Sequence, residues 1–462
     1  MANLAITFCE LPDELILETI RHLSSIRSYE PQSTAFKDKE RERARQFENG
    51  VRQLALHSIC LTSHRFRRIA TPTLYASFLG SATLHGFDHV KLFYRTVSIP
   101  GYAVGLKVRL AEYVQYVENR LSDHLGNSLC ADTEYYDTVI MVVRYFSLLA
   151  DVIKQAPNVQ HLSVVSLEAE QVSFWNHILP SHYSTLAPSS SKMVADHGFR
   201  KLQTLCVQIH MGGYALRADL DWFRNICSAM TSVPSLADLR VSGVMTSGSF
   251  SPISGSFKSL KRIEITECVL SFDEVVDIWS ACEGLRHIAC EWAYYGAGDE
   301  PWELYSGLLQ HTKTLETLTL DMREVRFMSN AAPPLFGSLR SFAHLESLVI
   351  CETLLRVSAL PLLEFPDQLL QHRITELLPE QMKSFALLLY SNDRHENEPH
   401  DRLDEILALW NVVEDCKTTI PSLKVVSVIC GVPLCAPKLK EAFNKVGVQF
   451  EVIQQAKIEL PC

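Results

Sequence analysis

A short apolar phrase recurs along most of the chain and constrains its fold more than any other feature. It consists of one apolar residue, a second three positions later and a third two positions after that. Residues two positions apart point to the same side of a β-strand, so each phrase predicts a short strand with one buried face. The nine occurrences are Val159/Leu162/Val164, Leu202/Leu205/Val207, Leu236/Leu239/Val241, Leu260/Ile263/Ile265, Leu285/Ile288/Cys290, Leu315/Leu318/Leu320, Leu345/Leu348/Ile350, Met382/Phe385/Leu387 and Leu423/Val426/Val428.

The spacing of these phrases is that of a degenerate repeat. In the middle of the chain their central residues, from Leu239 to Leu348, stand 24, 25, 30 and 30 positions apart. Such steps are close to the roughly 20–29 residues of a leucine-rich repeat. Helical stretches such as 272–279 lie between the phrases, and a strand–helix unit buries its apolar face only by stacking on its neighbours. We therefore expect an irregular, leucine-rich-repeat-like α/β solenoid over residues 156–462; a plain α/β domain is the alternative.

Composition narrows the class of protein. The chain has 462 residues, 47% hydrophobic and 21% charged, and a net charge of −10, which argues against a general nucleic-acid binder. Its 13 cysteines stand mostly inside apolar runs, which is typical of reduced thiols in the cytoplasm or nucleus. No signal peptide is visible, and the most apolar stretch, residues 139–153, carries Arg144 and Asp151 and is too short to cross a membrane.

The motifs that would carry chemistry are missing from the sequence. Pro399 interrupts a pair of histidines that stand close to carboxylates, His395 and His400, so no continuous helix can present both to a metal. Four residues lie between Cys430 and Cys435, rather than the two of a Cys-x-x-Cys motif, and no second pair follows. We therefore expect no catalytic, cofactor-binding or metal-binding residues and no enzymatic activity. An enzyme whose site is assembled from distant loops is the alternative.

The first eighty residues predict two amphipathic helices. Residues 11–23 begin with a proline in the first turn and with acidic side chains at the positive end of the helix dipole. Leu15, Ile16, Ile20 and Leu23 fall on one side at helical spacing.

The second helix is predicted from an apolar stripe that runs from Leu56 to Phe66. Arg65, Arg67 and Arg68 lie outside this stripe, and we expect Pro72 to end the helix. A pair of helices this small is marginally stable alone, so their apolar stripes suggest a partner.

These two segments resemble an F-box. The resemblance rests on the opening Leu-Pro-x-Glu-Leu-Ile, the phrase Cys-Leu-Thr-Ser-His-Arg-Phe and the exit Ile-Ala-x-Pro-x-Leu-Tyr, and it is nearest to F-box proteins of filamentous fungi. The family implies a small three-helix module, here over residues 1–80, which docks on the Skp adaptor of a cullin–RING ubiquitin ligase. It also implies that the remainder of the chain captures a substrate, as the leucine-rich repeats behind many F-boxes do.

The chain departs from the family pattern by an insert at residues 24–53. Its basic and acidic side chains interleave, which favours either a solvated helix or a mobile loop over a nucleic-acid site. We therefore expect the insert to be dispensable for adaptor binding. Residues 81–155 are expected to form a helical linker that caps the repeats, with helices over residues 108–125 and 138–155.

The function implied by the resemblance is that of a substrate receptor in the ubiquitin conjugation pathway. The partners would be a Skp-type adaptor, through it a cullin–RING ligase, and an unidentified protein substrate, with no membrane and no nucleic acid. A repeat scaffold that binds proteins outside any ligase is the alternative. The residues expected to bind the adaptor are Leu11, Pro12, Leu15, Ile16, Ile20, Leu23, Ile59, Cys60 and Phe66.

A substrate is expected on the strand face opposite the repeat leucines, because outward strand positions line the concave surface of a leucine-rich solenoid. Aromatic and arginine side chains there would dominate the binding energy. The residues expected to take part are Arg240, Arg262, Glu264, His287, Trp292, Tyr294 and Tyr295. The loops at 184–196 and 392–404 are the alternative recognition sites.

Overall fold

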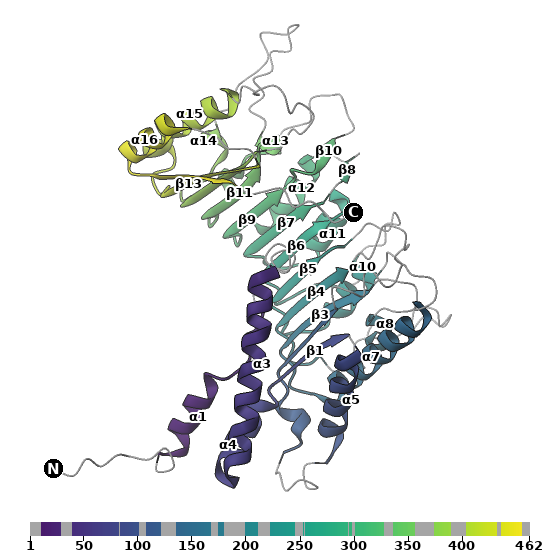
Figure 1. Cartoon of the computed structure of the whole chain (residues 1–462). Coiled ribbons are helices and arrows are strands. Elements are labelled where there is room, and N and C mark those ends of the chain that lie inside the picture. The colour runs from purple at the N-terminus through teal and green to yellow at the C-terminus, as the bar shows by residue number, and fades with distance from the viewer. Residues whose placement is uncertain are drawn as a thin grey trace, which may run out of the picture. The chain divides into compact units, whose positions relative to one another are not determined.

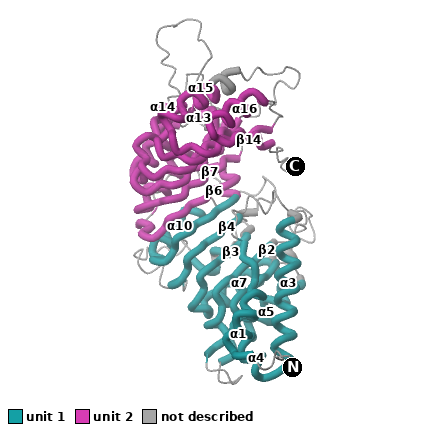
Figure 2. The backbone as a smooth tube through the Cα atoms, turned by 90° about the vertical axis from the view of Figure 1, so that its left-hand side faces the viewer, with its two compact units in different colours: residues 1–242 teal, residues 243–462 magenta. Residues whose placement is uncertain are grey.

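The structure, a computed structural model, describes most of the chain. The described residues are 11–28, 39–82, 84–100, 108–121, 135–167, 174–179, 199–210, 222–244, 253, 255–293, 295–297, 301–327, 336–355, 374–389, 403–431 and 436–454. The protein is α/β, with a main sheet of twelve parallel strands in this part of the chain (Figure 1). It divides into two compact units, residues 1–242 and 243–462 (Figure 2). The boundaries expected at residues 80 and 155 both fall inside the first unit.

The first unit contains five strands of the main sheet, in the order β1-β2-β3-β4-β5. Its elements are α1 (Asp13–Arg21), α3 (Lys39–Thr62), α4 (His64–Leu74), β1 (Ser77–Ala82), α5 (Leu84–Ser98), the 3₁₀ turn η3 (Leu110–Tyr113), β2 (Tyr116–Leu121), α7 (Tyr135–Gln155), β3 (His161–Leu167), α8 (Trp175–Ile178), β4 (Thr204–His210), α10 (Trp222–Met230) and β5 (Asp238–Ser242). Figure 1 shows α5 and α7 along one side of these strands and α3 along the other.

The second unit contains seven strands of the main sheet, in the order β6-β7-β9-β11-β12-β13-β14. Its elements are β6 (Arg262–Cys268), α11 (Phe272–Ser280), β7 (His287–Trp292), β8 (Tyr295–Ala297), α12 (Pro301–Leu308), η4 (Leu309–His311), β9 (Thr317–Asp321), β10 (Val325–Phe327), η5 (Leu339–Ser341), β11 (Ser347–Cys351), α13 (Glu352–Leu355), α14 (Ile374–Leu377), β12 (Ser384–Leu388), α15 (Leu403–Thr419), β13 (Val425–Cys430), α16 (Pro437–Val446) and β14 (Gln449–Gln454). The short strands β8 and β10 pair with each other.

The second and third residues of all nine apolar phrases lie on strands, as the sequence predicts, and the first residue of each stands two positions before the strand. Strand register places their central residues opposite one another, so that a continuous buried row crosses each unit. In the second unit this row is formed by Ile263, Ile288, Leu318, Leu348, Phe385, Val426 and Phe450. Each of these side chains is at most 3% exposed, so the row is the core of the unit.

The helix expected over residues 108–125 was a wrong prediction. The structure has the turn η3 followed by the strand β2, in which Val117 pairs with Leu162 of the central row and a buried polar residue, Asn119, takes the next inward position. The Asn119 amide donates to the backbone oxygen of Val165 and its side-chain oxygen accepts from the Val165 amide, both at 3.1 Å. Because these bonds satisfy the buried amide, a strand can form where the apolar spacing alone fits a helix. The helix expected over residues 138–155 is confirmed as α7.

The described cysteines are not joined in disulfides, and all but Cys60 are buried, which agrees with the reduced state expected from the sequence. Burial raises the pKa of Cys268 to about 12 and that of Cys351 to about 11. A thiol with a pKa this high is almost entirely protonated at neutral pH, and therefore weakly nucleophilic. These cysteines serve as small apolar side chains in the core.

The buried histidine His311 should make stability depend on pH. Its side chain is fully buried, its Nε2 donates to the Trp279 carbonyl at 3.2 Å, and its Nδ1 has no hydrogen-bond partner among the described residues. Burial lowers the pKa of His311 below its ordinary value of 6.5. The unfolded chain therefore takes up a proton below about pH 6.5 that the folded chain does not, and stability falls as pH falls.

Urea unfolding should show a lower free energy of unfolding at pH 5 than at pH 7, and a smaller difference between the two pH values for His311→Gln. An equal pH dependence in the variant would contradict the assignment.

Candidate functional site

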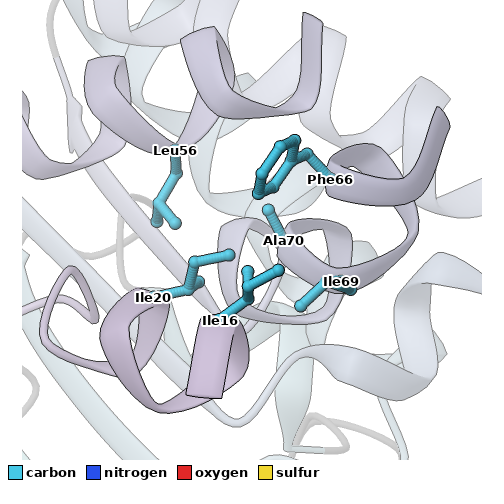
Figure 3. Close-up of a cluster of buried hydrophobic side chains, with 6 residues drawn as sticks. All are labelled: Ile16, Ile20, Leu56, Phe66, Ile69 and Ala70. Carbon is cyan, nitrogen blue, oxygen red and sulfur yellow. The ribbon is translucent and has the colours of Figure 1, made fainter. Parts of the chain in front are cut away.

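Three N-terminal helices form a small core of their own. Ile16 and Ile20 of α1 point toward Leu56 of α3 and toward Phe66 and Ala70 of α4 (Figure 3). All five are at most 8% exposed, and Ile69 completes the cluster. Burying each large aliphatic side chain contributes about 1.5–3 kcal/mol, so this cluster holds α1 against the other two helices.

The start of α1 is fixed by a proline and an ion pair. The Pro12 carbonyl accepts hydrogen bonds from the amides of Leu15 and Ile16. The Asp13 carboxylate accepts from Arg65 at 2.7 Å and from Arg68 at 2.6 Å, and Arg65 also donates to the Leu11 carbonyl. The hydrogen bond from Arg65 is the main cause that lowers the pKa of Asp13 below its ordinary value. These contacts orient α1 against the first turn of α4.

Ser63 divides the single helix predicted over residues 56–71 into two. Its backbone is extended, and its hydroxyl accepts from the amide of Phe66 at 3.2 Å, which caps the start of α4. Pro72 lies inside α4 and does not end it. A serine can serve as an N-cap within an apolar stripe because its hydroxyl replaces a missing backbone partner. The stripe from Leu56 to Phe66 is therefore shared between the end of α3 and the start of α4, rather than continuing along one helix.

The residues expected to bind an adaptor fall into three groups by exposure. Ile16, Ile20 and Phe66 are buried in the three-helix core and have no surface to offer a partner. The second group consists of Leu11, Leu23, Ile59 and Cys60, which are half-buried against that core. Pro12 and Leu15 are exposed, and the Leu15 side chain is 54% accessible. Only the last group is fully open to contact, while the first supports the module from within.

An exposed apolar stripe on α3 was missed by the sequence analysis. It is formed by Phe47, Val51, Leu54 and Leu61, which are 47–75% exposed, with Ser58 between the last two. We call this set the α3 stripe. Its residues are spaced by four, three, four and three positions, so they lie along one side of the helix. The helical spacing of these apolar residues is visible in the sequence, but the many charged residues between them make the stripe hard to recognise.

The opposite side of α3 is anchored to the first unit by a buried ion-pair network. Arg45 donates to Glu118 of β2 at 2.5 Å and to Glu42 at 2.6 Å, and Arg120 donates to Glu118 at 2.8 Å. The Tyr116 hydroxyl donates to the same carboxylate. Burial alone would raise the pKa of Glu118, but Arg120 and Arg45 bring it below its ordinary value, so this carboxylate is charged.

Residues of the insert thus take part in the fold. Arg45 also donates to the Ile26 carbonyl at 2.7 Å, and the buried Asn49 side chain accepts from the Ile26 amide at 2.7 Å and donates to its carbonyl at 3.0 Å. Arg52 donates to the Ser24 carbonyl at 2.8 Å. The helix expected as one form of the insert is confirmed over residues 39–53, which belong to α3, but one side of this helix is packed against the protein rather than solvated. Residues 29–38 of the insert lie outside the described residues.

The first of the residues expected to bind a substrate, Arg240, belongs to the first unit and is buried. Its guanidinium donates to both oxygens of Asp238 on the same strand, at 2.9 and 2.8 Å, and its side chain is 10% exposed. A side chain held and covered in this way is unavailable as a contact for a substrate.

In the second unit the expected substrate residues differ widely in exposure. Arg262, which is 36% exposed at its side chain, donates to the buried Glu264 at 3.0 Å. His287 is half-buried, and its Nδ1 shares a hydrogen bond of 2.9 Å with the Thr317 hydroxyl. Trp292 is 2% exposed and donates to the Leu270 carbonyl, so it is a core residue rather than a contact for a substrate. Arg262 and His287 therefore remain as accessible side chains.

Some expected residues cannot be placed. Tyr294, the loop at 184–196 and residues 392–402 of the second loop lie outside the described residues. Tyr295 is in β8, which pairs with β10.

One cavity of about 810 Å³ lies in the second unit between η5, α14 and α15. Its lining includes polar side chains and charged side chains of both signs, among them Arg340, Glu376 and Asp415. The Thr375 hydroxyl donates to Asp415 at 2.8 Å and thereby ties α14 to α15. In the part of the chain that the structure describes, no cluster of three metal-ligating side chains occurs, and no helix is long and apolar enough to cross a membrane.

Comparison with known proteins gives no further guide to the site. Neither the models of known protein families nor the curated protein sequences contain a match to this chain.

Proposed function

We propose that this protein is a substrate receptor of a Skp–cullin–F-box ubiquitin ligase. Its three N-terminal helices would bind the Skp-type adaptor as an F-box does, and its repeats would hold a protein substrate. The observation that carries the proposal is the three-helix core around Ile16, Ile20 and Phe66, next to which Pro12 and Leu15 stay exposed. A helical module that keeps apolar side chains outside its core has surface for a partner to cover.

The parallel sheet supports the second half of the proposal. In the second unit each strand of the main sheet pairs with the next one along the chain, and strand positions alternate between buried and half-exposed, for instance along β7 and β9. Such pairing fits a leucine-rich-repeat-like solenoid, in which each strand–helix unit would contact only its neighbours. On β7, β9 and β11 the half-exposed positions lie side by side and offer a surface with spaced polar side chains.

A protein substrate would be held on this face around Arg262 and His287. Nearby, Arg286 forms an ion pair with Glu316 at 3.3 Å, and both side chains are more than a third exposed. A surface with both signs of charge suits a protein partner better than a polyanion, because a polyanion meets repulsion from the carboxylates. The ligase chemistry itself would belong to other subunits, and the chain would act by raising the local concentration of the substrate.

Removing both accessible side chains should weaken substrate capture without affecting the adaptor. We expect the double variant Arg262→Gln, His287→Gln to retain less than about a tenth of the substrate, since each lost polar contact at an interface is worth about 1 kcal/mol or more. Substrates recovered with the wild type under proteasome inhibition provide the readout, and Lys440→Gln on α16 is the matched surface control. Equal recovery with the double variant would place the recognition surface elsewhere.

Co-purification tests the proposal as a whole. The full chain, expressed together with a Skp-type adaptor and a cullin, should elute with both in one complex of equal stoichiometry. A chain that elutes alone while the adaptor binds the cullin would favour the alternative of a scaffold that acts outside a ubiquitin ligase.

A further inference from the structure

The α3 stripe has the geometry that receives another helix. Its alternating steps of four and three positions average 3.5 residues, which is the period of residues that meet a partner helix along a shared seam. Phe47 and Leu61 at its ends are 14 positions apart, so the stripe is about 21 Å long at 1.5 Å per residue. Gly50 lies between Phe47 and Leu54 on the same side, and a methyl group there would meet no atom within 4 Å. This open position allows a second helix to approach closely.

The charge of the three helices selects the kind of partner. Residues 11–28 and 39–76 carry ten basic and six acidic side chains; without the buried Arg45, whose charge Glu118 compensates, their net charge is +3, in a chain whose net charge is −10. A second copy of the chain would bring a +3 module against a +3 module, which opposes self-association. An acidic partner would be attracted to it, and complementary charge both speeds the encounter and excludes wrong partners.

We infer that an acidic amphipathic helix of the adaptor lies along α3 and covers the stripe from Leu61 back to Phe47. This inference rests on the proposed function and extends it, because Phe47 and Val51 belong to the insert. The insert thereby becomes part of the docking surface, contrary to the expectation that it is dispensable.

The anchoring of α3 explains how an inserted segment can serve as a docking surface. Arg45, Asn49 and Leu56 hold one side of the helix to the protein, and the α3 stripe occupies the other side. The helix is therefore ordered before the partner arrives, so binding does not have to order it.

Removal of two large stripe residues tests the inference. We expect Phe47→Ser, Leu54→Ser to weaken adaptor binding about 100-fold in isothermal titration calorimetry of the full chain, about tenfold for each side chain. The matched control is Leu92→Ser, Ile140→Ser, which removes two side chains of the same unit that are 57% and 47% exposed on α5 and α7. The control should bind as the wild type does, and thermal unfolding should show that both variants fold.

The possible outcomes separate the inference from the proposed function. If the stripe variant binds the adaptor with the same affinity as the wild type, the inference is overturned and the proposed function stands. Absence of adaptor binding by the wild type would overturn both. A wild type that sediments as a dimer, with a stripe variant that sediments as a monomer, would assign the stripe to contact between copies and overturn the adaptor as its occupant.

Discussion

Replacing Glu118 by glutamine should lower the free energy of unfolding of the first unit by about 3 kcal/mol. The carboxylate is 4% exposed and lies against the guanidinium groups of Arg45 and Arg120. Glutamine keeps the shape of the side chain but removes its charge, so that two largely covered cations, 11% and 13% exposed, lose this carboxylate and keep Glu42 as a counter-charge. Removing one partner from a buried ionic network typically costs about 3–5 kcal/mol, and the remaining pairs with Glu42 place this case at the lower end.

Chemical unfolding of the full chain, followed by far-ultraviolet circular dichroism, measures this effect. Glu112→Gln is the matched control, because Glu112 pairs with Arg109 on the surface, where both side chains are more than a third exposed. An exposed pair contributes about 0–1 kcal/mol, so the control should stay close to the wild type. A Glu118→Gln protein as stable as that control would mean that the network does not anchor α3.

Replacing Leu15 by aspartate should reduce adaptor binding at least 100-fold without unfolding the chain. The side chain is 54% exposed, so the folded protein loses little apolar contact. In the complex, aspartate would lose roughly 1.5–3 kcal/mol of apolar burial and would place a carboxylate in an apolar contact. About 2.7 kcal/mol corresponds to a 100-fold change in affinity.

Leu92→Asp is the control for this variant, since Leu92 is similarly exposed on α5 of the same unit. Ile16→Asp makes the complementary comparison. Ile16 is fully buried in the three-helix core, so its replacement should abolish binding by unfolding the module, with a loss of helical signal that Leu15→Asp does not show. Equal binding by Leu15→Asp and Leu92→Asp would contradict the proposed contact.

The sequence predicts the strands well because their apolar positions repeat at a period of two. The second and third residues of all nine phrases lie on strands of the main sheet, but β1, β2 and β14 were missed. In β1 a glycine, Gly80, occupies the register position that Asn119 takes in β2. In β14 only Phe450 is buried, since this strand pairs with β13 alone among the described strands. Edge strands lack the apolar pattern by which interior strands are recognised.

The candidate site was harder to predict, because exposure depends on contacts between distant parts of the chain. Leu15 and Ile16 are neighbours in sequence, yet one is exposed and the other fully buried. The pairing of Arg45 with Glu118 spans 73 positions and cannot be read from the charge pattern of the insert. Arg240 stands at a position that the strand pattern allows to be exposed, whereas packing in the folded chain covers it. Trp292 lies on the same side of β7 as Ile288 and Cys290, so the period of two itself places it in the core.

The most direct test of the central claim is a calorimetric titration of a purified Skp-type adaptor into the full chain. We predict saturable binding of one adaptor per chain with a Kd of about 1 μM or tighter, and no measurable binding by Leu15→Asp. Absence of binding by the folded wild-type chain would contradict the assignment of its N-terminal helices as an adaptor-docking module.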